Sequence, residues 1–92
     1  MLTRVVQVVP QRDHQVFVYF EDGKIVRYDA TKLLKKRVFQ PLNDINLFMS
    51  TCTVMNHTLA WDLSGDRDPA NCLDIDPETL HELPPEEDIL KS

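Results

Sequence analysis

The chain has 92 residues, of which 42% are hydrophobic and 27% are charged, and its formal net charge is −5. This length fits one domain that buries about 60–65% of its unfolded surface, and the composition excludes a disordered chain. No apolar run approaches the roughly 20 residues that a membrane-spanning helix needs. The first ten residues lack the basic leader and cleavage site of a secretory signal, so we expect a cytoplasmic location.

The charge is divided unevenly along the chain. Residues 1–46 hold eight Lys and Arg against five acids, whereas residues 47–92 hold two against ten. The simpler interpretation is a solvated surface that ends in an acidic tail. The alternative is a basic surface for an acidic partner, with an acidic end that repels nucleic acid.

The first half of the chain predicts a strand followed by a β-hairpin. Residues 3–9 are rich in β-branched valine, which favours a strand. Residues 15–20 and 25–28 predict the hairpin, because Asp22-Gly23 supplies the two positive-φ positions of a type I′ turn. With this two-residue loop, Phe20 faces Ile25 and Tyr19 faces Val26.

In that register both faces of the hairpin are apolar apart from Arg27. One face carries Val16, Val18, Phe20 and Ile25, and the other carries Phe17, Tyr19, Val26 and Tyr28. An antiparallel sheet with one solvated face alternates apolar and polar residues, so this hairpin needs cover on both sides. We therefore predict that the second set is covered either by the C-terminal segment of the chain or by a partner, which would be a second copy or another small protein.

A central helix is predicted next, over residues 30–38. Asp29 is a natural N-cap, and Leu33, Leu34 and Val38 fall on one stripe at helical spacing. Pro41 forbids simple continuation of this helix. A short helical turn capped by Asp44 is expected after it.

The second half predicts another hairpin and a short closing helix. Residues 51–55 and 58–61 are the strands, joined at Asn56-His57, and Trp61 is expected in the core. Asp76-Pro77 combines an N-cap with proline at the first helical position, so a helix over residues 77–82 follows. The fold class is a small single α+β domain of antiparallel hairpins over residues 1–83, with an acidic, flexible tail over 84–92.

The acidic loop after Trp61 resembles the start of a calcium loop. Its alternating oxygen ligands are Asp62, Ser64, Asp66 and Asp68. The match fails where Arg67 replaces the required glycine and Leu73 replaces the bidentate glutamate. We interpret these residues as turn formers and predict neither a metal site nor a cofactor.

Catalytic motifs are missing from the sequence. With Gly23 and Gly65 as its only glycines, the chain has no phosphate loop or dinucleotide fingerprint. None of the three histidines adjoins a Ser or Cys nucleophile. Cys52 and Cys72 are expected to be reduced, buried side chains. We predict that the protein is not an enzyme.

A nucleic-acid-binding regulator is the alternative function. Its candidate contacts are Lys32, Lys35, Lys36 and Arg37 on the predicted central helix. The net negative charge and the lack of a helix-turn-helix or a stacking platform count against it.

Several segments together resemble a known family. They are residues 20–24, 28–29, 33–34, 39–42, 48, 59–61 and 74–80, with Asp22, Gly23, Trp61, Asp74, Asp76 and Pro77 as signature positions. In this order they resemble the bacterial family called domain of unknown function 2442. His81 departs from the family pattern, which usually has tyrosine there.

The resemblance implies a small α+β fold, with no established activity and no agreed site residues. Relatives occur alone, fused to DNA-binding helices, or paired with a second small protein in suspected toxin–antitoxin modules. We therefore expect a non-enzymatic interaction or regulatory module. The resemblance also implies an accessory role in such a pair.

Overall fold

The structure is a computed structural model, which describes residues 3–63 and 73–86. The described elements, in chain order, are β1 (Val5–Pro10), β2 (Gln15–Phe20), β3 (Ile25–Asp29), the 3-10 helices η1 (Ala30–Lys35) and η2 (Arg37–Asn43), α1 (Ile45–Thr51), β4 (Cys52–Met55), β5 (Thr58–Trp61), β6 (Leu73–Asp74) and α2 (Pro77–His81). Within these residues the strands form two antiparallel sheets of three, in the orders β1-β2-β3 and β4-β5-β6. The predicted small α+β architecture is confirmed.

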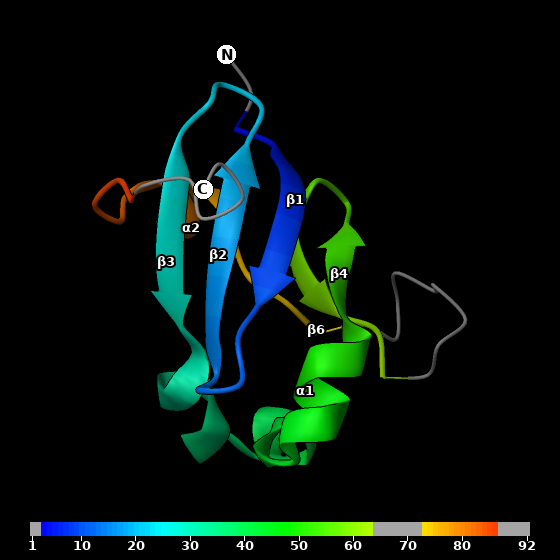
Figure 1. The fold of residues 1–92 in the computed structure, drawn as a ribbon. Coiled ribbons are helices and arrows are strands. Elements are labelled where there is room, and N and C mark those ends of the chain that lie inside the picture. The colour runs from blue at the N-terminus through cyan, green and yellow to red at the C-terminus, as the bar shows by residue number, and fades with distance from the viewer. Residues whose placement is uncertain (1–2, 64–72, 87–92) are drawn as a thin grey trace.

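The sheet β1-β2-β3 forms the front layer of the molecule (Figure 1). Behind β2 and β3 lies α2, and η1, η2 and α1 gather at the lower end of the sheet. On the other side β1 runs beside β4, and the Val5 N–H donates to the carbonyl of His57 (2.8 Å). No described helix covers the front face of the sheet.

The turn between β2 and β3 has three residues, so the predicted two-residue loop was wrong. The Gly23 N–H donates to the carbonyl of Phe20 (3.0 Å), and the Phe20 N–H donates to that of Lys24 (2.9 Å). Gly23 has φ 93°, but Asp22 lacks the positive φ that a type I′ turn requires. This geometry fits a tight turn followed by a left-handed residue, where glycine carries no Cβ penalty.

The longer turn shifts the pairing of β2 with β3 by one residue. Tyr19 faces Ile25, and Val18 faces Val26. Because side chains alternate between faces, a shift of one residue on β3 moves each of its side chains to the opposite face. Val26 therefore lies in the core with 0% exposure, and Ile25 moves to the front face.

The predicted single central helix is not what the structure contains. Two 3-10 helices, η1 and η2, take its place, and Lys36 between them is extended (ψ 136°). Like charges three and four residues apart disfavour a continuous α-helix through this basic segment. Val38 is 60% exposed rather than part of a buried stripe, and Pro41 lies inside η2.

The predicted N-caps are confirmed. The side chains of Asp29, Asp44 and Asp76 accept backbone N–H groups at the starts of η1, α1 and α2. At such a start the first N–H groups have no partner within the helix, so a carboxylate that accepts one fixes where the helix begins.

The second hairpin is also confirmed. Asn56 (φ 52°) and His57 (φ 63°) adopt the two positive-φ positions of its turn. Strand β6, which pairs with β5, was not predicted. It is held near β5 by Thr58, whose hydroxyl donates to the carbonyl of Ile75.

The core lies behind the front sheet and contains most of the aromatic side chains. Its largest fully buried members are Trp61, Phe48, Leu42, Leu59 and Leu80. The Trp61 ring packs on Phe48 at a centroid distance of 5.7 Å and meets Phe39 edge-on at 6.2 Å. The prediction that Trp61 belongs to the core is confirmed.

Candidate interaction surface

The front face of the sheet β1-β2-β3 is the candidate interaction surface, and we call it the outer face. By strand alternation its members are Gln7, Val9, Gln15, Phe17, Tyr19, Ile25, Arg27 and Asp29. Phe17 is central, because it lies opposite Val9 on β1 and Arg27 on β3. Phe17, Val9 and Ile25 are half-buried, whereas Tyr19 keeps only 9% exposure. The four apolar members thus form two neighbouring cross-strand pairs, Phe17 with Val9 and Tyr19 with Ile25, on a face that carries no described helix.

An exposed valine lies at the margin of the outer face. Val6 is 57% exposed, at a point where the pairing of β1 with β2 shifts between Val5 and Gln7. Such a bulge leaves one residue without a partner on the neighbouring strand. Val6 and Val38 are the exposed large hydrophobic residues among those described, and they lie on different elements.

The structure divides the four predicted partner-binding residues between the two faces. Phe17 and Tyr19 lie on the outer face, as the sequence suggested. Val26 belongs to the buried core, and Tyr28 packs against that core from the inner side. The one-residue shift in register places Val26 and Tyr28 out of reach of a partner on the outer face.

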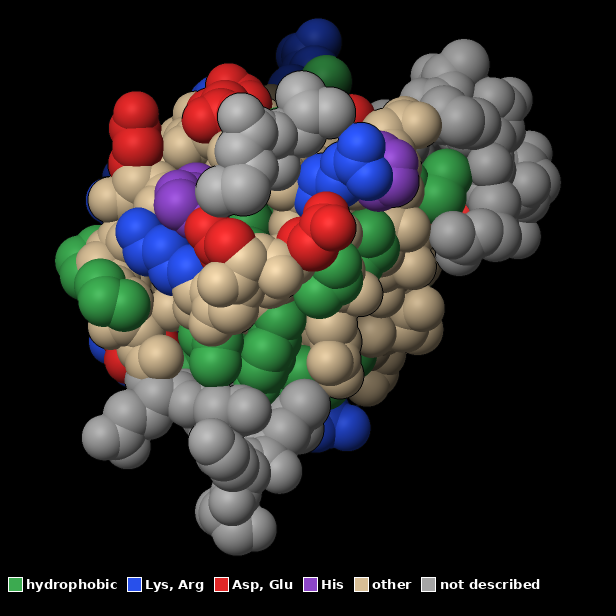
Figure 2. All heavy atoms as spheres, turned by 90° about the horizontal axis from the view of Figure 1, so that it is seen from above, with side chains coloured by type: hydrophobic (Ala, Val, Ile, Leu, Met, Phe, Trp, Pro, Cys, Tyr) green, Lys and Arg blue, Asp and Glu red, His purple; other side chains and the backbone are tan. Residues whose placement is uncertain are grey.

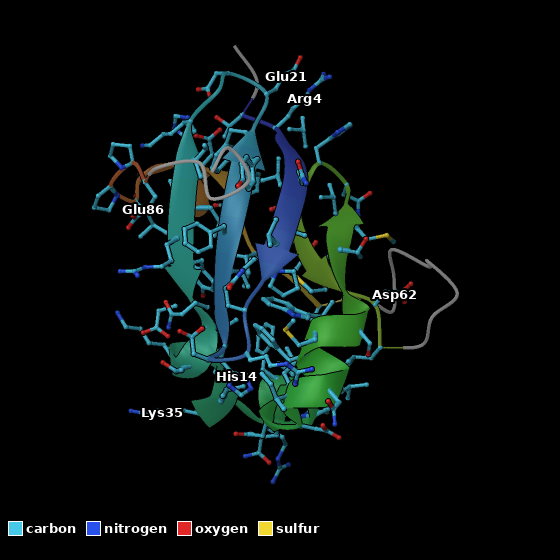
Figure 3. All side chains as sticks on the ribbon, in the orientation of Figure 1. Arg4, His14, Glu21, Lys35, Asp62 and Glu86 are labelled. Carbon is cyan, nitrogen blue, oxygen red and sulfur yellow. The ribbon has the colours of Figure 1, made fainter. Side chains whose placement is uncertain are left out.

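Residues 84–86 lie along the free edge of β3, and we call them the strap. Pro85 forms a bridge with Val26, and the Glu86 N–H donates to the carbonyl of Ile25 (2.7 Å). Arg27 Nε lies 3.8 Å from Glu86 Oε1. Figure 3 shows Glu86 beside β3. The predicted flexible tail therefore begins with residues that pair with the sheet, and 87–92 lie outside the described residues.

Polar contacts also join the β2–β3 turn to α2. His81 Nε2 lies 2.8 Å from Asp22 Oδ2, and the Lys24 ammonium group donates to the carbonyl of His81. The ring of His81 meets Phe20 edge-on at 4.8 Å. Figure 2, which views this end of the molecule, shows histidine, acidic and basic side chains close together. His81 thus has a local use as the partner of Asp22.

Hydrogen bonds hold the pKa of Asp22 below its usual range. The main cause is the N–H of Lys24, which donates to Oδ1 (2.9 Å), and the contact with His81 lowers the pKa further. A carboxylate with a lowered folded-state pKa adds stability above its unfolded pKa and loses it as the pH falls through the folded value.

We expect the stability difference between the wild type and Asp22→Asn to shrink under acid conditions. Asparagine keeps an acceptor for the Lys24 N–H but removes the charge. Thermal unfolding midpoints of both proteins, measured between about pH 5 and pH 2, test this because the unfolded carboxyl titrates near 3.9. A difference that stays constant over this range would contradict the assignment.

The four candidate nucleic-acid contacts are all exposed but do not form one helical face. Lys32 and Lys35 lie on η1, Lys36 lies at the break, and Arg37 begins η2. The Lys35 side chain points away from the body of the molecule (Figure 3). Two further basic residues of this half contact other groups, since Lys24 donates to the carbonyl of His81 and Arg27 lies beside Glu86.

The acidic loop contributes only its first residue to the described structure. Asp62 is buried at the end of β5, whereas Ser64, Asp66 and Asp68 lie outside the described residues. Among the described residues, no three His, Cys, Asp or Glu side chains lie where they could hold a metal ion. Residues 3–63 and 73–86 also contain no helix long and apolar enough to cross a bilayer.

The contacts of His14 and the burial of Cys52 indicate structural roles for these two residues. The His14 ring bonds to the carbonyl of Leu42 (2.8 Å) and meets Phe48 edge-on, which ties the β1–β2 turn to η2 and α1. Cys52 is a free thiol, and burial raises its pKa to about 12, so the nucleophilic thiolate is scarce at neutral pH. Cys72 lies outside the described residues.

The structure defines a small α+β domain. Its outer face carries an apolar cluster, and the neighbouring edge of β3 is paired with the strap. The model of a protein of unknown function, DUF2442, matches residues 5–85. The chain belongs to this family. No curated protein and no solved structure matches it.

Sequence reasoning missed the strap and the pairing of Asp22 with His81. Pro84-Pro85 ends the preceding helical segment, and proline also favours the extended conformation that suits a sheet edge. Nothing in the sequence brings residues 22 and 81 together, because their proximity depends on how α2 docks behind the front sheet.

Proposed function

We propose that this protein is a non-enzymatic interaction or regulatory module that binds a small protein partner, or a second copy of itself, through the outer face. The observation that carries the proposal is the apolar cluster on that face, with Phe17 at its centre. A solvated antiparallel face is normally polar, so Val9, Phe17 and Ile25 are best explained by contact with another molecule.

The polar margin of the face also suits a protein interface. Gln7 and Arg27, both exposed, would supply the polar rim that surrounds the apolar centre of an interface. The suspected gene pairing of family members agrees with a small protein as the partner.

Phe17→Asp tests the proposal, and Val38→Asp is the matched control. The control places the same charge on an exposed apolar residue of η2, away from the outer face. Light scattering across a concentration series is expected to give a wild-type mass above the monomeric 10.7 kDa, or a stable complex with the product of a neighbouring gene. Phe17→Asp should abolish the association and Val38→Asp should preserve it.

A monomeric mass at every concentration, together with no retained partner, would contradict this function. Equal effects of the two substitutions would show that the outer face is not the contact surface. The folded state of both variants is checked by their thermal unfolding.

Nucleic-acid binding through Lys32, Lys35, Lys36 and Arg37 is the second candidate, supported by the exposure of all four side chains. Binding of this kind releases counterions, so its affinity must fall steeply with added salt. A titration with duplex and single-stranded DNA at two salt concentrations distinguishes it from contact through the outer face. Binding that does not change with salt would exclude it.

A further inference from the structure

The free edge of β3 offers backbone groups to a further strand. β3 is the last strand of its sheet, and the strap is the one segment among the described residues that pairs with its outer side. The carbonyl of Ile25 points to that side, because it accepts the Glu86 N–H. Since this orientation alternates along an antiparallel strand, the backbone of Arg27 and Asp29 faces the same way. An unpaired edge of this kind is a template for an incoming strand.

The strap covers only the first part of this edge. Its bridge lies at Val26, so the end of β3 at Asp29 extends beyond it. Two of its three residues are proline, which has no N–H to donate, and Glu86 supplies the hydrogen bond that joins the strap to Ile25. A segment with more N–H groups would pair with more of the edge.

The strap is also weakly held. Pro84, Pro85 and Glu86 are exposed, and the side chains of Arg27 and Glu86 are 55% and 37% exposed, so solvent screens their attraction. The preceding helix is anchored differently, because Leu80 is fully buried in the core. The strap is therefore able to leave the edge while α2 stays in place.

The charges along the edge indicate what kind of segment it accepts. The strap already places a glutamate on Arg27, in an extended antiparallel arrangement. Immediately beyond β3, the exposed Lys32 and Lys35 lie on η1. The Asp29 carboxylate at the end of β3 accepts from Thr31 and is balanced by Lys32. Arg27 and Lys35 are then the cations that favour acidic side chains on a segment that continues past the strap toward η1.

We propose that the edge of β3 is a strand-addition site for an extended acidic segment of the partner protein, and that the strap occupies this site in the free protein. The proposal rests on the proposed function, because it names the chemistry of the partner that the outer face would contact. Main-chain hydrogen bonds provide affinity in this mode of recognition, and alternate side chains provide specificity. Partner binding is then a competition with residues 84–86.

Glu86→Pro in the full-length chain tests the competition. Proline removes the N–H that donates to Ile25 and the carboxylate that faces Arg27, and it lies in an exposed segment that does not carry the core. Glu86→Gln is the control, because it removes the charge and keeps the N–H. The probe is a synthetic peptide in which glutamate alternates with valine, so that every position has an N–H to donate, and a second peptide has its glutamates replaced by lysine.

The acidic peptide is expected to bind Glu86→Pro about three- to tenfold more tightly than the wild type, the effect of losing one hydrogen bond from the competing strap. Its largest backbone amide shifts in NMR spectra should fall at Arg27 and Asp29. The affinity of Glu86→Gln for the acidic peptide should lie between those of the wild type and Glu86→Pro. Adding Arg27→Glu to Glu86→Pro should weaken binding of the acidic peptide, and the lysine peptide should not bind Glu86→Pro.

Equal affinities for the wild type and Glu86→Pro, equal binding of both peptides, or shifts centred away from β3 would overturn the proposal. Dimerisation of Glu86→Pro without peptide that the wild type does not show, with amide shifts at the β3 edge, would show that the occupant is a second copy, which also overturns the assignment to a partner. These outcomes are independent of Phe17→Asp. Association through the outer face can survive when the β3 edge binds no peptide, so failure of the two proposals is distinguishable.

Discussion

Replacing Trp61 with alanine is expected to lower the free energy of unfolding by about 3–5 kcal/mol, as for other buried aromatic residues. Trp61 is fully buried on β5 and packs against Phe48 and Phe39, which come from different helices. Small domains have a total stability on the order of 5 kcal/mol, so the variant should be largely unfolded on mild heating. Urea denaturation followed by circular dichroism measures the loss.

Trp61→Phe is the control for this experiment. Trp61 Nε1 is buried and has no hydrogen-bond partner among the described residues. Phenylalanine removes this unsatisfied N–H, which is a gain of about 1–3 kcal/mol that offsets part of the lost volume. Trp61→Phe should therefore cost much less than Trp61→Ala. Equal losses for both would mean that the indole N–H is satisfied in solution, and the packing account would need revision.

Features that depend on a few neighbouring residues were predictable. Asp29, Asp44 and Asp76 were assigned as caps because a carboxylate before a helix satisfies its first N–H groups, and this needs no tertiary information. The hairpin at Asn56-His57 was also found, because two residues there adopt positive φ in a loop of only two positions. Local chemistry leaves few alternatives at such sites.

The β2–β3 register shows where local chemistry stops being sufficient. Asp22-Gly23 fits the two-residue turn that was predicted, but Gly23 also serves as the left-handed residue of a three-residue turn, which is what forms. The burial of the β3 side chains decides which of the two turns forms. The longer turn places Val26 in the core with Val16 and Val18, and it leaves the charged Arg27 on the outer face.

The candidate surface was predictable in part for the same reason. Phe17 and Tyr19 lie on β2, whose alternation fixes that they share a face, and the structure places both on the outer face. Val26 and Tyr28 were assigned to that face from the predicted register. Because the register was wrong by one residue, their assignment was wrong as well. The strap was missed because its partners on β3 are about sixty residues away in sequence, and one bridge and one hydrogen bond leave no periodic pattern.

Leu80→Ala is the second substitution with a large expected effect, about 2–5 kcal/mol of the free energy of unfolding. Leu80 is the buried residue of α2 and belongs to the same core cluster as Phe20 and Val26. A helix of five residues has almost no stability of its own, so its position depends on this side chain. Urea denaturation gives the size of the loss.

The loss of Leu80 should also release what α2 positions. His81 would no longer be held against Asp22 and Lys24, and the strap would lose its fixed starting point. Hydrogen exchange at the Glu86 amide should therefore accelerate in Leu80→Ala. Thr79→Ala changes an exposed neighbour on the same helix and is expected to stay within about 0.5 kcal/mol of the wild type. If both substitutions had the same small effect, α2 would not be anchored through Leu80, and the strap would have to be held by its own contacts with β3.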